Sequence, residues 1–389
     1  MRILNVIMCL DSIGGGGSVE RIYQLSRHLS LVGKDCTILT TKQGWDEEHI
    51  LKLGKVKVVA LPYISERFKI PLGLFGWLNK HILDYEIVHL AMNWTMINAI
   101  TYLYLRYYNR PYVFSAMGWL TIDGRSKLIK HIYRNLFTKR MVRNAGVCIA
   151  VTKREVNDYV NFGVDPKRIV RIPNGINPES FCDKDDEAFR VRYGLDARPI
   201  ILFIGRIDPI KGPDLLLRAF YGISESFPNY QLVIAGNDLG FLSNLKTLAR
   251  SFGLEEKTRF LGHIGGKELS WAYHAANVFV IPSRYDTMTI VALGAAASGT
   301  PVLLTDRCDF GELQEAGGGL SVECSVKGLE NGLRRLLSDP VQLKTIGRRA
   351  REFVISKYSW EQVCKQFIDV FQAASLPVYS CKDATSNRH

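Results

Sequence analysis

The sequence lacks any apolar run of the roughly 18–20 residues that a helix needs to span a bilayer. It also lacks C-x-x-C spacing, because its eight cysteines are scattered and several lie inside apolar runs. This pattern disfavours a zinc site or a disulfide framework and indicates free thiols in a reducing, cytoplasmic environment. A hydrophobic content of 47% with 23% charged residues excludes a disordered chain, and a length of 389 residues predicts two domains.

Acidic residues are absent between Gly124 and Arg154, although the whole chain carries 38 of them at a net charge of +12. Apolar residues recur there near helical spacing, which predicts an amphipathic basic helix over residues 125–143. Such a helix either packs on its own domain or docks on an anionic membrane surface, and we take the membrane as the expected partner. No nucleic-acid-binding module accompanies the charge, so we expect no nucleic-acid partner. The apolar residues are Leu128, Ile129, Ile132, Tyr133, Leu136 and Phe137.

Short apolar segments alternate with longer helical patterns in both halves of the chain, which predicts parallel sheets with crossover helices. A turn signal at residues 172–175 marks the domain boundary. We therefore expect an α/β protein with two Rossmann-like βαβ domains, residues 1–175 and 176–357. An amphipathic helix over 358–375 and a polar tail over 376–389 follow. The main expected strands are 3–9, 35–41, 56–61, 87–90, 112–115, 147–151, 200–204, 231–235, 259–261, 277–281 and 302–305.

The segment from Ile281 to Asp306 carries the clearest chemical signal. Its polar loop feeds the start of a buried helix, where free N–H groups and the positive end of the helix dipole suit a phosphate. Four glycines, residues 14–17, follow the first strand and let the backbone approach a diphosphate closely. Val19 stands where a dinucleotide-binding G-x-G-x-x-G motif needs its third glycine, which excludes that motif. A flexible loop remains the alternative for the four glycines.

Two cations, Arg206 and Lys211, follow the expected strand 200–204. Side chains at the carboxyl end of a strand in an α/β sheet face the ligand crevice. A diphosphate leaving group gains negative charge as a glycosidic bond breaks, and fixed cations stabilise that charge. The alternative is a pair of solvated surface cations.

These segments resemble the retaining glycosyltransferases of the family-4 type. IPSRYDTMTIVALGAAASGTPV is similar to that family's PS-x-x-E-x-F-G loop and A-x-G-x-P-V helix end, and GRIDPIKG to its G-R-x-x-x-x-K-G. GGGGSVER and YSWE match its first βα unit and its closing helix. The resemblance implies the GT-B arrangement, in which an active-site cleft lies between two Rossmann-like domains and the closing helix packs back on the first. It also implies metal-independent and cofactor-free transfer from a nucleoside-diphosphate sugar.

The resemblance assigns roles to residues by their place in these motifs. It implies that Arg206 and Lys211 stabilise the diphosphate and that Asp286 replaces a Glu that holds the donor sugar. Gly294 replaces a second Glu that holds the ribose, a loss that should weaken nucleotide binding by about tenfold or more. We therefore expect Asp286 to be the remaining anchor of the donor sugar. Gly294→Ala should then affect activity less than replacement of Asp286 does. The other expected donor contacts are Gly16, Gly17, Gly236, Asn237, Gly262, His263, Thr287, Met288, Thr289 and Ile290.

Met117 occupies the place where relatives carry a His near the reacting sugar. Retention in this family is usually viewed as a front-face displacement, in which the leaving phosphate takes the acceptor's proton, so no protein base is required. His89 and His263, each at the end of an expected strand, are the alternatives for a direct role.

The implied function is retaining transfer of a sugar to a lipid-linked saccharide in bacterial surface polysaccharide or lipopolysaccharide synthesis. The expected location is cytoplasmic, peripheral to the inner face of the cell membrane. Two alternatives stay open. One is a GT-B enzyme that acts on a soluble acceptor, and the other is a catalytically silent partner of an active transferase. The lost Glu at position 294 favours the silent partner, whereas the intact Arg206 and Lys211 favour the enzyme.

Overall fold

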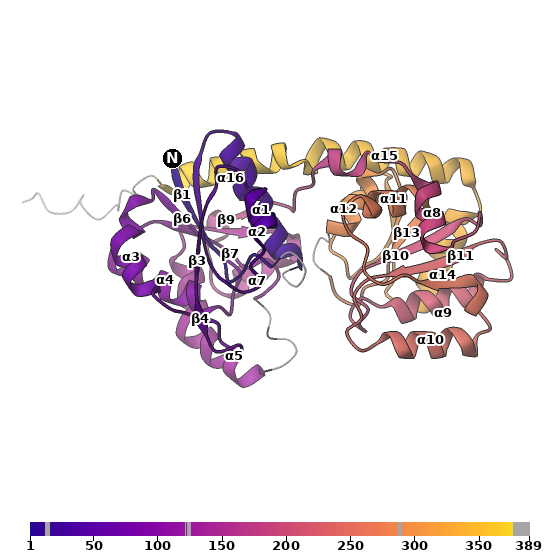
Figure 1. Cartoon of the computed structure of the whole chain (residues 1–389), viewed down its shortest axis with the longest axis horizontal. Coiled ribbons are helices and arrows are strands. Elements are labelled where there is room, and N and C mark those ends of the chain that lie inside the picture. Colours follow the sequence, from indigo (N-terminus) through magenta and orange to yellow (C-terminus); the bar gives the residue numbers. More distant parts are fainter. Residues whose placement is uncertain (12–15, 121, 123–125, 287–289, 376–389) are drawn as a thin grey trace, which may run out of the picture. The chain divides into compact units, whose positions relative to one another are not determined.

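A computed structural model describes residues 1–11, 16–120, 122, 126–286 and 290–375. The chain divides into two compact units (Figure 1). The first comprises Met1–Ile172 and the described residues from Cys364 onward, and the second comprises Pro173–Val363. In the part of the chain that is described, no helix is both long and apolar enough to cross a bilayer.

The first unit is built on a seven-stranded parallel sheet in the order β3-β2-β1-β6-β7-β8-β9. The first strand of the chain lies inside the sheet, and the strand order reverses between β1 and β6. This is the doubly wound Rossmann order, in which ligands bind outside the carboxyl ends of the strands at the reversal. The strands are β1 (Arg2–Val6), β2 (Asp35–Thr41), β3 (Lys57–Leu61), β6 (Ile87–Ala91), β7 (Tyr112–Ser115), β8 (Val147–Ala150) and β9 (Ile169–Arg171).

Helices cover both faces of this sheet. On one face, α3 and α4 pack through an apolar cluster that includes Leu4, Leu78 and Leu105. On the other face, Asn5 of β1 donates a hydrogen bond to Ser26 of α1, and α16 packs beside it. The helices are α1 (Gly16–Leu31), α2 (Glu47–Leu51), α3 (Leu74–His81), α4 (Met96–Tyr107), α5 (Lys127–Tyr133), α6 (Lys139–Asn144), α7 (Lys153–Asn161) and α16 (Trp360–Ser375).

Two features of the first unit concern the basic stretch and its surroundings. The chain is helical from Lys127 to Asn144, with the π-helical turn Arg134–Thr138 between α5 and α6, which agrees with the helix predicted over 125–143, although Arg125 lies outside the described residues. A short antiparallel hairpin, β4 (Tyr63–Ile64) with β5 (Ile70–Pro71), stands apart from the sheet. The sequence analysis predicted no strands there, because segments of two residues carry no alternation to detect.

The second unit repeats the architecture with six parallel strands in the order β12-β11-β10-β13-β14-β15. All five residues of β10 are apolar and buried, as expected for a parallel strand covered on both faces. The order reverses between β10 and β13. The strands are β10 (Ile200–Ile204), β11 (Gln231–Ala235), β12 (Thr258–Phe260), β13 (Ala276–Ile281), β14 (Val302–Thr305) and β15 (Gly319–Val322).

The helices of the second unit also form two layers (Figure 1). α9 (Pro213–Ile223), α10 (Leu242–Ser251) and α14 (Val326–Leu337) cover one face of the sheet. The helices on the other face are α8 (Asp186–Tyr193), α11 (Lys267–Ala275), α12 (Ile290–Ala297) and α15 (Pro340–Tyr358). A short helix, α13 (Glu312–Glu315), precedes β15. The structure thus confirms the predicted pair of Rossmann-like α/β domains.

α15 is a helix that the sequence analysis did not predict. Asp339 caps its first turn by accepting hydrogen bonds from Val341 N and Gln342 N, and Pro340 occupies a position where a helix needs no N–H donor. α16 follows directly. It begins at Trp360 in the second unit, and its residues from Cys364 onward belong to the first.

Candidate active site

The candidate site lies at the carboxyl edge of the sheet in the second unit, where the strand order reverses. β10 and β13 are neighbours there, and each is followed by a loop that the sequence analysis singled out. The loop after β10 runs from Gly205 to Gly212, and the described part of the loop after β13 runs from Pro282 to Asp286. Because neighbouring parallel strands end at the same edge, the two loops meet.

Lys211 and Asp286 form an ion pair across these loops. Lys211 Nζ lies 2.5 Å from Asp286 Oδ2, and Ser283 Oγ donates a hydrogen bond to the same oxygen at 3.3 Å. Only 20% of the lysine side chain and 11% of the aspartate side chain are exposed. Asp286 N also donates to Arg307 O at 3.1 Å, which fixes the backbone that carries the carboxylate. The structure therefore joins two groups to which the family resemblance assigned separate roles.

Asp208 organises the two cations of the first loop. Its Oδ1 accepts a hydrogen bond from Lys211 N at 2.9 Å, and its Oδ2 lies 3.5 Å from Arg206 Nε. Arg206 is exposed, so its guanidinium is open to a ligand. The sequence analysis missed Asp208. The available signal was an Asp three residues before the Lys, a spacing at which a carboxylate can bond a nearby backbone N–H.

A second ion pair ties the loops together at the start of α9. Arg284 donates to both carboxylate oxygens of Asp214, at 2.8 and 2.6 Å, a bidentate geometry that is stronger than a single contact. Arg284 also donates from its side chain to Pro209 O at 2.5 Å and from its backbone to Ile210 O at 2.8 Å. Arg284 fills an unspecified position of the family's loop motif, so the sequence pattern did not point to it.

Glycines permit the close backbone contacts at this edge. A Cβ on Gly212, whose φ is +69°, would lie 2.1 Å from Pro282 O. A Cβ on Gly236 would lie 1.7 Å from Gly205 O, and Gly236 N donates to Gly262 O at 2.6 Å. The backbones at the ends of β10, β11 and β12 therefore touch one another directly, which only glycine allows.

The other expected donor contacts follow the same strands. Asn237 comes directly after Gly236, and its carbonyl accepts a hydrogen bond from Ile207 N at 2.8 Å. Gly262 and His263 follow β12, and His263 is exposed. The expected contacts Thr287, Met288 and Thr289 lie outside the described residues. Ile290, the last of the set, is the first residue of α12.

Gly294 lies in the middle of α12 and is buried. A Cβ there would lie 2.8 Å from Tyr273 Cε2 and 3.0 Å from Phe181 Cε1. This enclosure argues against the expected donor contact at Gly294, because two aromatic rings face the position and glycine has no side chain to reach a ribose. It also argues against the expectation that Gly294→Ala matters little, since the added methyl group would overpack the space.

The glycine-rich stretch belongs to the first unit. Gly16 and Gly17 open α1 and are both exposed, and Gly16 has a φ of +62°. Gly14 and Gly15 lie outside the described residues. A helix of 16 residues that begins with exposed glycines presents free N–H groups and its positive dipole end to an anion.

The turn that carries Met117 is held from behind by a buried carboxylate. Met117 and Gly118 have positive φ values of 55° and 83°. Glu155 accepts hydrogen bonds from Gly118 N and Val151 N, both at 2.7 Å. Burial raises the pKa of the Glu155 carboxyl, and these two N–H donors act against that shift. The sequence analysis missed Glu155, although it stands three residues after the N-cap Thr152, the spacing of a capping box.

His89 is a buried structural residue, so the alternative that gave it a direct role is wrong. Its Nδ1 lies 3.0 Å from Asn5 Oδ1 and its Nε2 lies 2.7 Å from Ser115 Oγ. The rings of Phe367 and Phe371 on α16 pack against the imidazole. Burial, reinforced by nearby Arg21, lowers the pKa of the His89 imidazole to about 3, so the ring is neutral at physiological pH.

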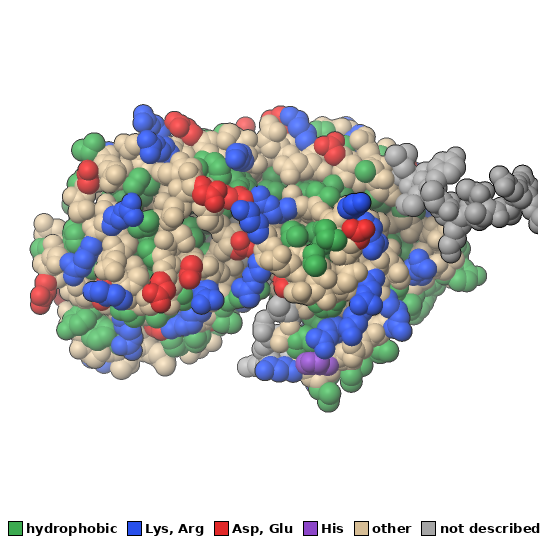
Figure 2. All heavy atoms as spheres, turned by 180° about the vertical axis from the view of Figure 1, so that it is seen from behind, with side chains coloured by type: hydrophobic (Ala, Val, Ile, Leu, Met, Phe, Trp, Pro, Cys, Tyr) green, Lys and Arg blue, Asp and Glu red, His purple; other side chains and the backbone are tan. Residues whose placement is uncertain are grey.

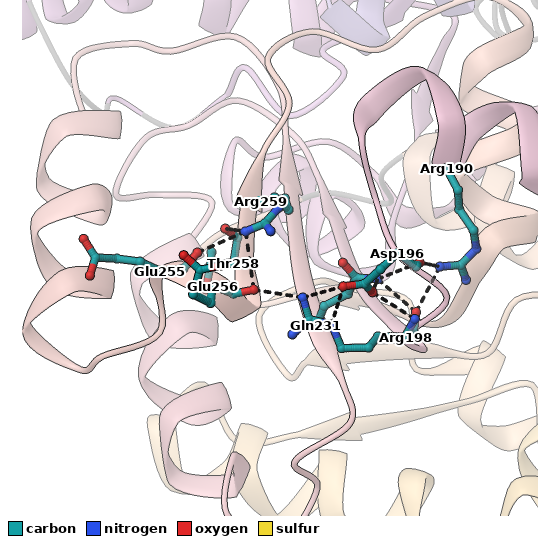
Figure 3. Close-up of polar contacts among 8 residues, drawn as sticks. All are labelled: Arg190, Asp196, Arg198, Gln231, Glu255, Glu256, Thr258 and Arg259. Carbon is teal, nitrogen blue, oxygen red and sulfur yellow. Dashed lines mark hydrogen bonds and ion pairs between the residues drawn. The ribbon is translucent and has the colours of Figure 1, made fainter.

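The amino edge of the sheet in the second unit carries a different polar network (Figure 3). Gln231, the first residue of β11, donates to Asp196 Oδ1 at 3.2 Å and to Arg198 O at 2.9 Å. Arg198 pairs with Asp196 and donates to Glu256 O at 2.9 Å. Ligands bind at the opposite edge of an open α/β sheet, so this network fastens the strand starts and is not a second candidate site.

Two family models match the chain, "Glycosyltransferase Family 4" over residues 15–180 and "Glycosyl transferases group 1" over residues 185–353. The chain is 24% identical to the D-inositol 3-phosphate glycosyltransferase of Corynebacterium aurimucosum over 395 residues, which cover 94% of this chain and 93% of that protein. It is similar in structure to Anabaena HepE in complex with UDP, with a TM-score of 0.79 and 16% identity over 96% of this chain and 100% of that one. It is also similar to WaaG, a glycosyltransferase involved in lipopolysaccharide biosynthesis, with a TM-score of 0.70 and 18% identity over 95% of this chain and 99% of that one. The chain therefore belongs to the group 1, family-4-type glycosyltransferases of GT-B fold.

Proposed function

We propose that this glycosyltransferase moves a hexosyl group from a nucleoside-diphosphate sugar to a saccharide acceptor, with retention of configuration and without a metal ion or cofactor. The observation that carries the proposal is the Lys211–Asp286 pair where the strand order reverses, with Arg206 exposed on the same loop as Lys211. Cations at this edge suit a diphosphate, and an ionised carboxylate accepts strongly from sugar hydroxyls. The UDP bound to HepE supports a uridine nucleotide as the donor to test first.

The proposed chemistry depends on fixed positive charge beside the leaving diphosphate and does not require a protein base to deprotonate the acceptor. The leaving diphosphate gains negative charge as the glycosidic bond breaks, and Lys211 and Arg206 stabilise this charge as preorganised donors. A leaving phosphate oxygen takes the proton of the acceptor hydroxyl on the same face of the sugar. No protein base enters this scheme, and the burial of His89 is compatible with that.

We propose further that the acceptor is a lipid-linked saccharide at the inner face of the cell membrane, in surface polysaccharide or lipopolysaccharide synthesis. The cationic segment from Lys127 to Asn144 and the likeness to WaaG support this acceptor. The inositol phosphate glycosyltransferase relatives favour a soluble acceptor instead. The absent carboxylate at Gly294 favours a catalytically silent partner.

A donor screen tests the proposal. The melting temperature and the release of free nucleoside diphosphate are measured with UDP-, GDP- and dTDP-sugars, with and without membrane lipid extract. A rise in melting temperature with one nucleotide series, together with lipid-dependent release, supports the proposal. Stabilisation by a donor without turnover on lipid or soluble acceptors points to the silent partner, and no response to any donor contradicts both enzymatic functions.

We expect Asp286→Asn to lower kcat/KM for the donor at least about tenfold, because a charged acceptor for the sugar hydroxyls is lost. The same change removes a negative charge beside Lys211, so the affinity for UDP alone should stay equal or rise. Calorimetric titration with UDP and with the nucleotide sugar separates these effects. Weaker binding of UDP itself would show that Asp286 acts by holding Lys211 and does not contact the sugar.

We expect simultaneous replacement of Lys127, Lys139 and Arg140 by Gln to weaken binding to anionic vesicles about a hundredfold, since each cation near such a surface contributes about 1 kcal/mol. Binding of the wild type should also fall as salt rises, because exposed charges are screened. Vesicle sedimentation measures both effects. Indifference of the wild type to lipid charge would contradict the membrane proposal. The charge-matched control replaces three exposed cations of the second unit, Lys246, Lys344 and Arg348.

A further inference from the structure

The hairpin of β4 and β5, residues 63–71, exposes two large apolar side chains. Ile64 is 51% exposed and Phe68 is 42% exposed. Ser65 closes the turn by accepting Lys69 N at its carbonyl, at 2.9 Å, and Phe68 N at its hydroxyl, at 3.3 Å. A two-stranded hairpin outside a larger sheet is marginally stable in water. The β4–β5 hairpin nevertheless exposes apolar side chains to solvent, on a turn that the two hydrogen bonds of Ser65 hold in place.

Cations accompany the aromatic rings of this hairpin. The Arg67 guanidinium lies 5.5 Å from the centre of the Phe68 ring, and the Lys69 ammonium lies 4.5 Å from that of Tyr63. Lys69 also pairs with Glu66, which neutralises the one acidic residue of the hairpin. Arginine, lysine and tyrosine side chains each combine an apolar body with a polar end, which suits the boundary between water and hydrocarbon.

The hairpin lies against the start of α5. Arg67 Nη2 donates a hydrogen bond to the hydroxyl of Ser126, the N-cap residue of α5, at 3.1 Å. Beyond it, Leu128, Ile132 and Leu136 are 75%, 52% and 53% exposed. Leu128 and Ile132, four apart on α5, share one face of that helix, and Leu136 extends this exposed apolar row into the π-helical turn that follows. Figure 2 shows Lys and Arg side chains beside apolar ones on the lobe that carries α5.

We propose that the hairpin tip and the apolar row on α5 and its π-helical turn form one lipid-binding surface, defined by Ile64, Arg67, Phe68, Leu128, Ile132 and Leu136, and that the tip inserts into the interface of an anionic phospholipid bilayer. This proposal rests on the proposed function, in which the acceptor is linked to a membrane lipid. It adds a contact between the hairpin tip and the bilayer, to which no sequence motif pointed.

The charge pattern selects the bilayer as the occupant. The exposed cations Lys127, Lys139 and Arg140 flank the apolar row in the chain, and no acidic residue occurs between Gly124 and Arg154. Anionic headgroups above acyl chains complement cations around an apolar strip. A protein partner would need its own acidic rim around an apolar centre, whereas an anionic bilayer presents this combination over its whole surface.

Insertion of the hairpin predicts behaviour that charge alone does not. Attraction between exposed cations and headgroups weakens as salt screens it, whereas burial of an apolar ring does not depend on screening. Phe68→Ser should therefore lower the partition coefficient about tenfold on vesicles of phosphatidylcholine with one-third phosphatidylglycerol, and should leave the slope of binding against salt unchanged. Leu51→Ser, on α2 of the same unit, is the matched exposed-residue control and should bind as the wild type.

A second variant reports contact directly. Phe68→Trp keeps an aromatic tip, and lipids with brominated acyl chains should quench its fluorescence beyond the quenching of the wild type. The proposal is overturned if Phe68→Ser binds vesicles as tightly as the wild type and brominated lipids do not quench Phe68→Trp. It is also overturned if the protein does not bind vesicles and the variants instead change its oligomeric state. Stabilisation by UDP should be the same in every variant, so failure of the lipid-binding surface and failure of the proposed function are read separately.

Discussion

Lys211→Ala is expected to lower the rate of donor turnover about a hundredfold, which corresponds to about 2.7 kcal/mol of lost transition-state stabilisation. Lys211 is the enclosed cation of the site and is already oriented by Asp208 and Asp286. Its removal takes away a preorganised donor and also leaves the Asp286 carboxylate without its ion-pair partner near the diphosphate. The measurement is the initial rate of nucleoside diphosphate release at saturating donor.

Three variants make this prediction specific. Lys246→Ala removes an exposed cation of the same unit and should leave the rate unchanged. Arg206→Ala should have a smaller effect than Lys211→Ala, because the exposed guanidinium is screened by water. The double variant Lys211→Ala/Asp286→Ala should lose less transition-state stabilisation than the sum of the losses in the two single variants, since the two groups are in contact. A loss of less than about threefold in Lys211→Ala, with an unchanged melting temperature, would contradict the role of Lys211.

Gly212→Ala is expected to lower both stability and activity. The left-handed φ of +69° alone costs an alanine about 1–2 kcal/mol. The new Cβ would lie 2.1 Å from Pro282 O, so the two loops must also separate, which adds about 1–3 kcal/mol of overpacking. Because Lys211 and Asp286 sit on those loops, their pairing should loosen and the rate should fall. Chemical denaturation and initial rates measure the two effects.

Gly194→Ala separates strain from crowding. Gly194 ends α8 with a φ of +60°, close to that of Gly212, but no heavy atom lies within 4 Å of its added Cβ. This variant should therefore show only the conformational part of the loss and keep full activity. Equal destabilisation by the two variants would mean that the contact between the loops does not constrain the site.

The positions of the main strands could be predicted from the sequence because parallel strands covered on both faces read as continuous apolar runs. β10 is such a run, and Arg206 and Lys211 follow its carboxyl end in the chain. The general place of Asp286 follows in the same way from the end of β13. Sequence position alone therefore located the loops of the candidate site.

The contacts within the site could not be predicted, because they join residues far apart in the chain. The pairing of Lys211 with Asp286 depends on β10 lying beside β13. The crowding at Gly294 depends on Phe181, which comes from another segment of the second unit. The sequence predicted that His89 lies near the end of a strand, but it is the middle residue of β6 and is covered by α16, which the sequence does not show.

The first domain is completed by residues from the far end of the chain, since Phe367 and Phe371 cover the face of the sheet that carries His89. During synthesis, all of Pro173–Val363 must be made before these residues exist. At about 5–20 residues per second the ribosome needs roughly 10–40 s for that stretch. During this time part of the apolar surface of the N-terminal domain stays uncovered, while all strands of the second domain are synthesised. In the nascent chain it is thus the first domain to emerge, and not the second, that presents the longer-lived binding surface to a chaperone.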